Sequence, residues 1–489
     1  MDRPNVFVVV IDALRQDHVG IYCGCRRIQT PAIDEVATDG VTFEQAFTTT
    51  NATDPAILSL LSGRYPTQTL LNHGERITDE DRRRAWGTTR LPPVLQDSGY
   101  RTIQTGRGLG RWIADGFDIY QDPVEQWGDG STLAQIRTQV ESIAGDLLGT
   151  LSPSLAGQIG AAYRDGPDCD PVGDLLDELD DQDDDRPVFA LSHLMDTHAG
   201  YSADNEFLPS RWVLEHFNTD TSLDHLAGEF GRDTPTGERC AYFARKWAHL
   251  VDGPVRLGLV EAMYRACVRQ ADARVGRLVD GLRERGLLED SWLVILADHG
   301  ESLSEHGIYH DHHGLYDETV RIPLVVRPPG GDDGRRISDL VQITDVAPTI
   351  ADIAGIDLGP TDGQCLLPLI NDDHSGWDPR HAVIADESYC QRRSMIRTPV
   401  AKLIYAPDGL DSCRYCDRVH GADPELFDLS TDPDEQSVIT GDDRAVSRLR
   451  EIDRQVRGGL CAAPIGIEID SNPTEQRAVA NQLEALGYR

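Results

Sequence analysis

Three apolar runs that end in acidic or imidazole side chains constrain the fold of this chain most strongly. They are Asn5–Ile11 followed by Asp12, Trp292–Ala297 followed by Asp298 and His299, and Val188–Leu191 followed by His193 and His198. Continuous apolar runs of this length are typical of strands buried on both faces of a parallel sheet. Because the carboxyl ends of parallel strands meet at one edge, the polar residues are expected to share one crevice. The sequence therefore predicts an α/β fold with a doubly wound, mostly parallel central sheet.

Helical and irregular segments fill the remainder of the chain. Apolar residues between Val260 and Leu282 recur at a helical period, and Gly286 is placed to end that helix. From about Asp372 onward the pattern changes to shorter strands and turns. We therefore expect a catalytic α/β domain over residues 1–371, and a smaller C-terminal α+β subdomain with a charged tail over residues 372–489.

The charge balance limits the partners of the protein. Its 489 residues include 46 Lys and Arg against 82 Asp and Glu, a formal net charge of −36. Such an acidic surface repels nucleic acid and anionic lipid head groups, so neither is an expected partner. We interpret the acidity as halophilic adaptation to a salt-rich cytosol; the alternative is an acidity tuned to a partner.

Sequence signals for location point to the cytoplasm. No apolar run approaches the ~20 residues of a membrane-spanning helix, and Met1–Asn5 leads directly into a strand without a secretory segment. A reducing compartment would keep the ten cysteines as thiols. Cys413 and Cys416 form one C-x-x-C pair, for which ordinary thiols are favoured over a small structural zinc or redox site.

Eight motifs resemble those of the sulfatase family, in the alkaline phosphatase superfamily, and they occur in the family's order. Each motif alone is weakly specific, but the ordered set covers most of the chain except 110–185 and the C-terminal end. The matching segments are Pro4–Gly20, Thr30–Phe43, Leu61–Pro66, Tyr100–Arg107, Met195–Tyr201, Ala297–Gly307, Gln342–Ile356 and Glu425–Glu435.

The resemblance implies one divalent cation at the edge of the sheet. Asp12, Asp298 and His299 are the expected protein ligands, because carboxylates and an imidazole offer lone pairs at neutral pH. In the family the nucleophile supplies a further ligand. The cation is expected to be Ca, Mg, Mn or Zn.

The nucleophile position departs from the family pattern. Counting back from Leu61–Arg64, the modified Cys or Ser of sulfatases falls on Thr53, and Pro55 supports this register. Ile57 replaces the Arg that assists formylglycine formation, so a formylglycine enzyme is not expected. A threonine hydroxyl can still attack a phosphoryl or sulfuryl group when a cation lowers its pKa. The alternative is an inert replacement in an inactive protein.

Two further departures concern the charges around the expected ester group. Ala13 replaces the second carboxylate of the usual Asp-Asp pair, which removes one anionic ligand. Arg107 stands where sulfatases have a lysine, and its guanidinium could bind a tetrahedral oxyanion. A surface arginine is nearly as good an interpretation.

Histidines supply the remaining candidates for catalysis. His198 follows the sulfatase pattern of an imidazole that contacts the oxyanion, whereas His193 is expected to be structural. Among the histidines after Asp298, His313 lies near the place of the family's substrate-binding lysine and could protonate a leaving group.

These observations predict a metal-dependent enzyme that hydrolyses or transfers a phosphate or sulfate ester group through Thr53. The substrate would be a small molecule or a glycan ester. One alternative is a cytoplasmic sulfo- or phosphotransferase that modifies a glycan or lipid-linked sugar precursor. The others are a phosphatase that uses metal-bound water and a binding protein that retains the fold without turnover. The sequence leaves the acceptor and the oligomeric state open.

Overall fold

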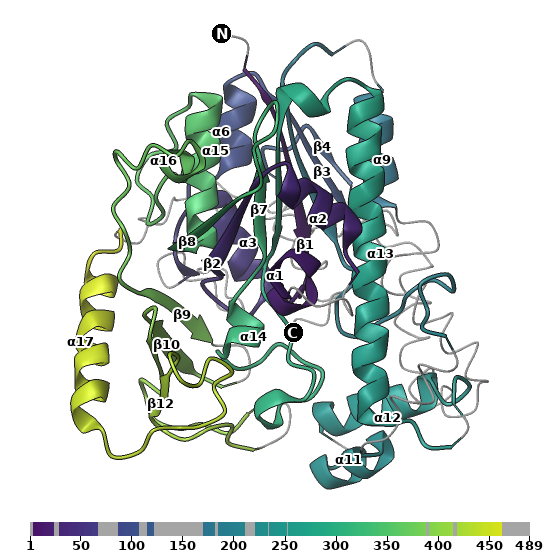
Figure 1. Ribbon diagram of the computed structural model, residues 1–489, viewed down its shortest axis with the longest axis vertical. Helices are drawn as coiled ribbons and strands as arrows, with labels where there is room; N and C mark the ends of the chain where they lie inside the picture. Colours follow the sequence, from purple (N-terminus) through teal and green to yellow (C-terminus); the bar gives the residue numbers. More distant parts are fainter. Residues whose placement is uncertain are drawn as a thin grey trace, which may run out of the picture.

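Two sheets of different size form the framework of the protein (Figure 1). The computed structural model describes residues 3–23, 29–66, 87–106, 115–121, 170–180, 184–210, 221–232, 234–251, 253–387, 391–413 and 418–461. Within these ranges, none of the helices combines the length and the apolar composition needed to cross a bilayer.

The larger sheet has eight strands and is mostly parallel. In spatial order they are β4 (Ile119–Tyr120), β3 (Arg101–Gly106), β5 (Val188–Leu194), β1 (Asn5–Ile11), β6 (Ser291–Ala297), β7 (Leu324–Arg327), β2 (Val41–Phe47) and β8 (Arg335–Gln342). Strand β7 pairs antiparallel with both of its neighbours, and the other pairs are parallel. The three apolar runs of the sequence are therefore the three central strands β5, β1 and β6.

Helices cover both faces of this sheet (Figure 1). On one face α13 (Leu257–Glu284) contacts α2 (Pro31–Thr38) and α9 (Pro171–Leu179). On the other face α15 (Val346–Ala354) contacts α3 (Thr53–Ser62) and α6 (Leu91–Asp97). The doubly wound arrangement predicted from the sequence is confirmed. Further helices are α1 (Gly20–Cys23), α11 (Leu223–Phe230), α12 (Pro235–Lys246), α14 (Asp317–Val320) and α16 (Leu367–Ile370).

The helix expected after residue 260 is confirmed and is longer than predicted. Its periodic apolar positions, among them Val268, Val275 and Leu282, are buried. Gly286 follows with a φ of +68°, a left-handed conformation that favours glycine beyond a helix end.

A four-stranded antiparallel sheet forms the smaller, C-terminal part. Its strands, in spatial order, are β12 (Glu425–Asp428), β11 (Ala401–Tyr405), β10 (Arg393–Arg397) and β9 (Val383–Glu387). Helix α17 (Asp443–Gly458) packs on it (Figure 1). The predicted α+β character of this part is confirmed. The division at residue 371 stays a prediction, and the tail from residue 462 lies outside the described residues.

A buried lysine ties the two sheets together. Lys402 of β11 is 0% exposed, and its Nζ lies 2.9 Å from Oδ1 of Asp317 in α14 and 2.7 Å from Oε1 of Glu435. Arg397 also pairs with Asp317, at 3.2 Å, so removing the ammonium leaves chiefly the buried carboxylate of Glu435 without compensation. We expect Lys402→Met to lower the free energy of unfolding by about 3–5 kcal/mol, measured by denaturant titration.

An exposed ion pair in the same sheet provides the control. Arg392 lies 3.6 Å from Asp408, and both side chains face solvent. Because exposed pairs contribute little, Arg392→Met should change the free energy of unfolding by less than about 1 kcal/mol. Equal effects of the two substitutions would show that Lys402 does not stabilise the contact between the sheets.

Candidate active site

Two carboxylates meet where the central strands end. Asp12 follows β1 and Asp298 follows β6, and these neighbouring parallel strands pair through Ile11 and Ala297. Both carboxylates are 0% exposed. Oδ1 of Asp298 accepts hydrogen bonds from the backbone N–H of Ala13, at 3.0 Å, and of His299, at 2.8 Å. The parallel register therefore fixes both acids at one edge of the sheet.

The imidazole of His299 faces the same point. Its Nδ1 lies 2.8 Å from the carbonyl oxygen of Gly300, which places the ring proton on Nδ1 in the neutral tautomer. Nε2 then presents its lone pair to the site, 3.5 Å from Oδ2 of Asp298. A Cβ at Gly300 would collide with the carbonyl of Glu318, so this tight turn requires glycine.

Thr53 is the first residue of α3 and is partly exposed. Its hydroxyl donates a hydrogen bond to Oδ2 of Asp12 at 3.1 Å, and its Oγ1 lies 3.2 Å from Nε2 of His299. The N-terminus of a helix carries unpaired N–H groups and a partial positive charge, which favour an anion there. The structure thus brings Thr53 to Asp12 and His299. Ile57, one turn further along α3, is 0% exposed in the core.

The donor set fits a divalent cation. Ligand atoms of Asp12, Asp298 and His299 all lie within 4.8 Å of one another. Oδ1 of Asp12 and Oδ2 of Asp298 are buried and have no hydrogen-bond partner among the described residues. Two buried carboxylates with an oxygen each left over require a compensating positive charge.

Electrostatics within the site agree with this reading. Burial alone raises the pKa of Asp12, but the contact with His193 and the charges of nearby histidines bring that pKa well below its usual value. Burial raises the pKa of Asp298, and the charge of Asp12 adds to the increase. One carboxylate is therefore held ionised at the expense of the other, as expected for two acids this close together.

Further imidazoles surround the two acids. Nε2 of His193, within β5, lies 3.5 Å from Oδ2 of Asp12, so this histidine lies nearer the site than a purely structural residue would. His198 follows β5 with Nδ1 3.1 Å from the carbonyl of Ala199, and its charge acts on Asp12. The ring centroid of His312 lies 4.5 Å from that of His299. Burial and the adjacent His299 hold the pKa of His312 well below its usual value.

The structure places His313 in a different cluster from its neighbour His312. Nδ1 of His313 lies 3.7 Å from Oδ2 of Asp311, and its ring centroid lies 5.0 Å from that of His420. The sequence prediction named His313, whereas the structure brings His312 to the ring of His299; the catalytic role of His313 stays a prediction. Consecutive side chains of an extended segment point in opposite directions, so only one of the two faces the acids. The alternation predicts that only one of the two histidines faces Asp12 and Asp298, but it does not predict which one.

Ala13 and Arg107 are the two other positions at which the chain departs from the family pattern. Ala13 has a φ of +54°, and its carbonyl accepts a hydrogen bond from the hydroxyl of Tyr264 at 2.7 Å. Its backbone N–H thus binds Asp298 where the family has a second carboxylate. A non-glycine residue in this conformation stores about 1 kcal/mol or more of strain, typical of functional sites. Arg107 lies outside the described residues.

Comparison with known proteins identifies relatives of the whole chain. The sulfatase family profile matches residues 4–356, and a profile described as N-sulphoglucosamine sulphohydrolase, C-terminal, matches residues 304–458. The chain is 25% identical to the uncharacterized sulfatase YidJ of Escherichia coli K12, over 73% of this chain and 69% of that protein. It is 22% identical to the N-acetylglucosamine-6-O-sulfatase of Bacteroides thetaiotaomicron, over 92% of this chain and 85% of that protein.

Solved structures share the fold. BT4656 in complex with its substrate D-glucosamine-2-N,6-O-disulfate has a TM-score of 0.65 at 20% identity, covering 98% of this chain and 99% of that one. The phosphonate monoester hydrolase of Agrobacterium radiobacter has a TM-score of 0.63 at 20% identity, covering 93% of this chain and 96% of that one. Because the family profile spans well over half of its residues, the chain belongs to the sulfatase family.

Proposed function

We propose that this protein is a metal-dependent hydrolase of phosphate- or sulfate-type esters that uses Thr53 as its nucleophile. One observation carries the proposal: Oγ1 of Thr53 lies 3.1 Å from Asp12 and 3.2 Å from His299, at the N-terminus of a helix. A hydroxyl in contact with a cation-binding set, and partly open to solvent, is placed to attack a tetrahedral group.

Asp12, Asp298 and His299 would hold the cation, with Oγ1 of Thr53 as a further ligand. Ca, Mg, Mn and Zn are the candidates, and sulfatase family members generally use a divalent metal. When bound, the ion supplies Lewis-acid stabilisation of the oxyanion and lowers the pKa of the attacking hydroxyl.

In the transfer step, the ester group exchanges its bond to the departing oxygen for a bond to Thr53, and the hydroxyl of Thr53 loses its proton. Oγ1 of Thr53 forms a bond to phosphorus or sulfur while the bond from that atom to the ester oxygen breaks. The hydroxyl proton passes from Oγ1 to Oδ2 of Asp12, which already accepts it in a hydrogen bond. The departing oxygen takes a proton from solvent, and Asp12 returns its own proton to solvent. His198, whose charge acts on Asp12, and His312, which lies against His299, would donate N–H hydrogen bonds to the developing charge. Water then cleaves the threonine ester and restores the hydroxyl.

The names of the relatives support a sugar ester as substrate. One relative is an N-acetylglucosamine-6-O-sulfatase, and one structural neighbour was solved with a disulfated glucosamine. Another neighbour is a phosphonate monoester hydrolase, which supports phosphorus esters as the second class. The first test is a panel of p-nitrophenyl phosphate, phosphonate and sulfate, and sulfated or phosphorylated glucosamines, with each candidate metal. Absence of turnover on every ester would favour a binding protein.

Transfer to a second alcohol is a specific alternative for sulfate esters. A sulfated threonine lacks the elimination route that formylglycine hydrate provides, so its hydrolysis is slow. Thr53 in place of the modifiable residue therefore favours a sugar acceptor over water if the group is sulfuryl. Adding glucosamine or a lipid-linked sugar to the assay separates the two: transfer gives a modified acceptor, and hydrolysis gives only free anion.

The two neighbouring histidines should differ in their effect on catalysis. Because His312 lies against His299, we expect His312→Ala to lower kcat/KM by about 10²-fold, the usual cost of removing one hydrogen-bond donor to a developing oxyanion. His313→Ala, which removes an imidazole from the separate cluster, should lower it by less than about tenfold. Steady-state kinetics on the best substrate checks this. The reverse order would return the leaving-group role to His313.

A further inference from the structure

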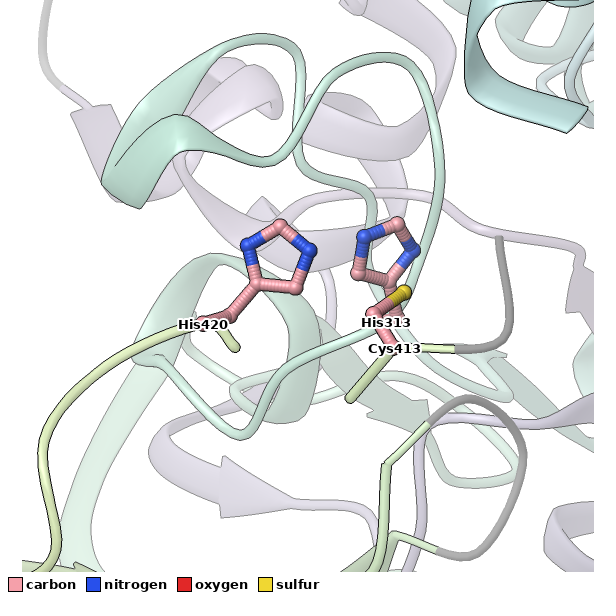
Figure 2. A group of neighbouring side chains, drawn as sticks. All are labelled: His313, Cys413 and His420. Atoms are coloured by element: carbon pink, nitrogen blue, oxygen red, sulfur yellow. The ribbon is translucent and has the colours of Figure 1, made fainter. Parts of the chain in front are cut away.

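A second cluster of metal-ligating side chains lies apart from the acids at the sheet edge. His313, Cys413 and His420 bring ligand atoms within 4.8 Å of one another (Figure 2). His313 lies on the segment between β6 and β7 of the large sheet, whereas Cys413 and His420 lie between β11 and β12 of the small sheet. We propose that His313, Cys413 and His420 form a zinc-type cation site that joins the two sheets.

The ligand chemistry selects a soft or borderline divalent metal. One thiolate with two imidazoles is a donor set that zinc favours, and that calcium and magnesium, which prefer oxygen, do not. This separates it from the Asp12 site, which offers two carboxylates and one imidazole. Of the C-x-x-C pair, Cys413 would thus be a ligand together with two histidines. Cys416 lies outside the described residues.

The geometry allows a tetrahedral ion after small side-chain movements. With Zn–S of about 2.3 Å and Zn–N of about 2.0 Å, tetrahedral ligand atoms are about 3.3–3.6 Å apart. Closing a triangle of up to 4.8 Å to this size moves each ligand atom by less than about 1 Å, within reach of side-chain rotation. Cys413 and His313 are buried, so the ion would be largely shielded from water.

Polar groups lie next to two of the three ligands. Oδ2 of Asp311 lies 3.7 Å from Nδ1 of His313, and Arg239 forms an ion pair with the same carboxylate. The backbone N–H of His420 donates to Oε1 of Gln391 at 3.2 Å. A carboxylate near the second ring nitrogen is a usual supporting partner of metal-bound histidine, and Asp311 takes that place for His313; Gln391 contacts only the backbone of His420.

Charge in the surroundings also favours a cation. A divalent ion with one thiolate leaves a net charge of one, and Glu387 is a buried carboxylate whose Oε1 accepts the N–H of Gly314 beside His313. This carboxylate would balance the charge of such an ion.

The third group of possible ligands shows why this cluster is preferred. His306, Glu318 and Glu435 also lie close together, but Glu435 is already paired with the ammonium of Lys402 at 2.7 Å. A positive side chain thus occupies the place of a cation there.

Cobalt(II) reconstitution of the full chain tests the site, because a thiolate bound to cobalt gives a charge-transfer absorption that oxygen and imidazole ligands do not. Metal-free wild-type protein should develop this band with cobalt and lose it on adding zinc. Cys413→Ser should abolish the band, and His420→Ala should weaken cobalt binding by about 100-fold or more. Asp12→Asn should keep it, because that substitution affects the other site.

Cys365→Ser is the matched control, since Cys365 is a partly buried thiol that contacts Asp352. It should leave the band unchanged. Absence of the band in the wild type, or its persistence in Cys413→Ser, overturns the proposal. If Cys413→Ser does not fold, the band in His420→Ala, titrated against a chelator, decides instead: wild-type affinity overturns the site. A missing band with intact ester cleavage would leave the proposed function standing.

Discussion

Replacing Thr53 with alanine is expected to lower kcat for ester cleavage by about 10³-fold or more, the scale seen when a nucleophile is removed. The substitution deletes the one hydroxyl that contacts both Asp12 and His299. Thr53 begins α3 and is partly exposed, so its truncation opens no core cavity and should leave folding intact. Thr53→Ser keeps an alcohol at the same position and should retain activity within about tenfold.

Covalent labelling provides the second readout of the same residue. A quenched reaction should show the peptide that carries Thr53 heavier by about 80 Da, the mass of a phosphoryl or sulfuryl group, and the alanine variant should show no such peptide. Accurate mass distinguishes the two groups.

Thr38→Ala serves as the control, because Thr38 is exposed on α2 and its hydroxyl bonds only to its own helix at Asp34. It should leave kcat unchanged. Full activity in Thr53→Ala would mean that water on the metal, rather than the threonine, attacks the ester.

Most of the fold was predictable from apolar patterning. The runs that became β1, β5 and β6 are buried on both faces, and such strands are recognisable without any tertiary information. Their polar ends were expected to converge, and Asp12 and Asp298 do so because β1 and β6 are parallel neighbours. The order of strands in the sheet is a tertiary property, so the sequence predicted a shared edge but not which strands adjoin.

The details of the site depend on contacts that sequence patterns do not encode. The choice between His312 and His313 depends on which way each side chain points from an irregular segment. The cluster of His313 with Cys413 and His420 forms only when the small sheet docks on the large one. No local periodicity reports such docking. The sequence shows the thiol of Cys413 as a possible metal ligand, but it does not predict that His313 and His420 lie beside it.

Replacing Asp298 with asparagine is expected to separate cation binding from folding. Asparagine has the same shape, and its oxygen can still accept the N–H bonds of Ala13 and His299. Its amide can also donate toward Asp12, which removes the repulsion between two buried acids. The metal-free variant should therefore melt at or above the temperature of the metal-free wild type.

Calcium or magnesium, which the His313 cluster does not favour, should then stabilise only the wild type. A ligand at 100 times its dissociation constant stabilises a protein by about 2.7 kcal/mol, which should appear as a higher Tm on adding the preferred metal. Asp298→Asn should show a much smaller increase and a loss in kcat of about 10²-fold or more, since the metal contributes several kcal/mol to catalysis. Asp97→Asn, an exposed carboxylate at the end of α6, should behave as wild type in both assays.

Because ligands must be ionised and burial raises the pKa of Asp298, cation affinity in the wild type should fall as the pH is lowered. An equal rise in Tm with metal in the wild type and in Asp298→Asn would place the cation elsewhere, and the proposed role of Thr53 beside it would lose its physical basis.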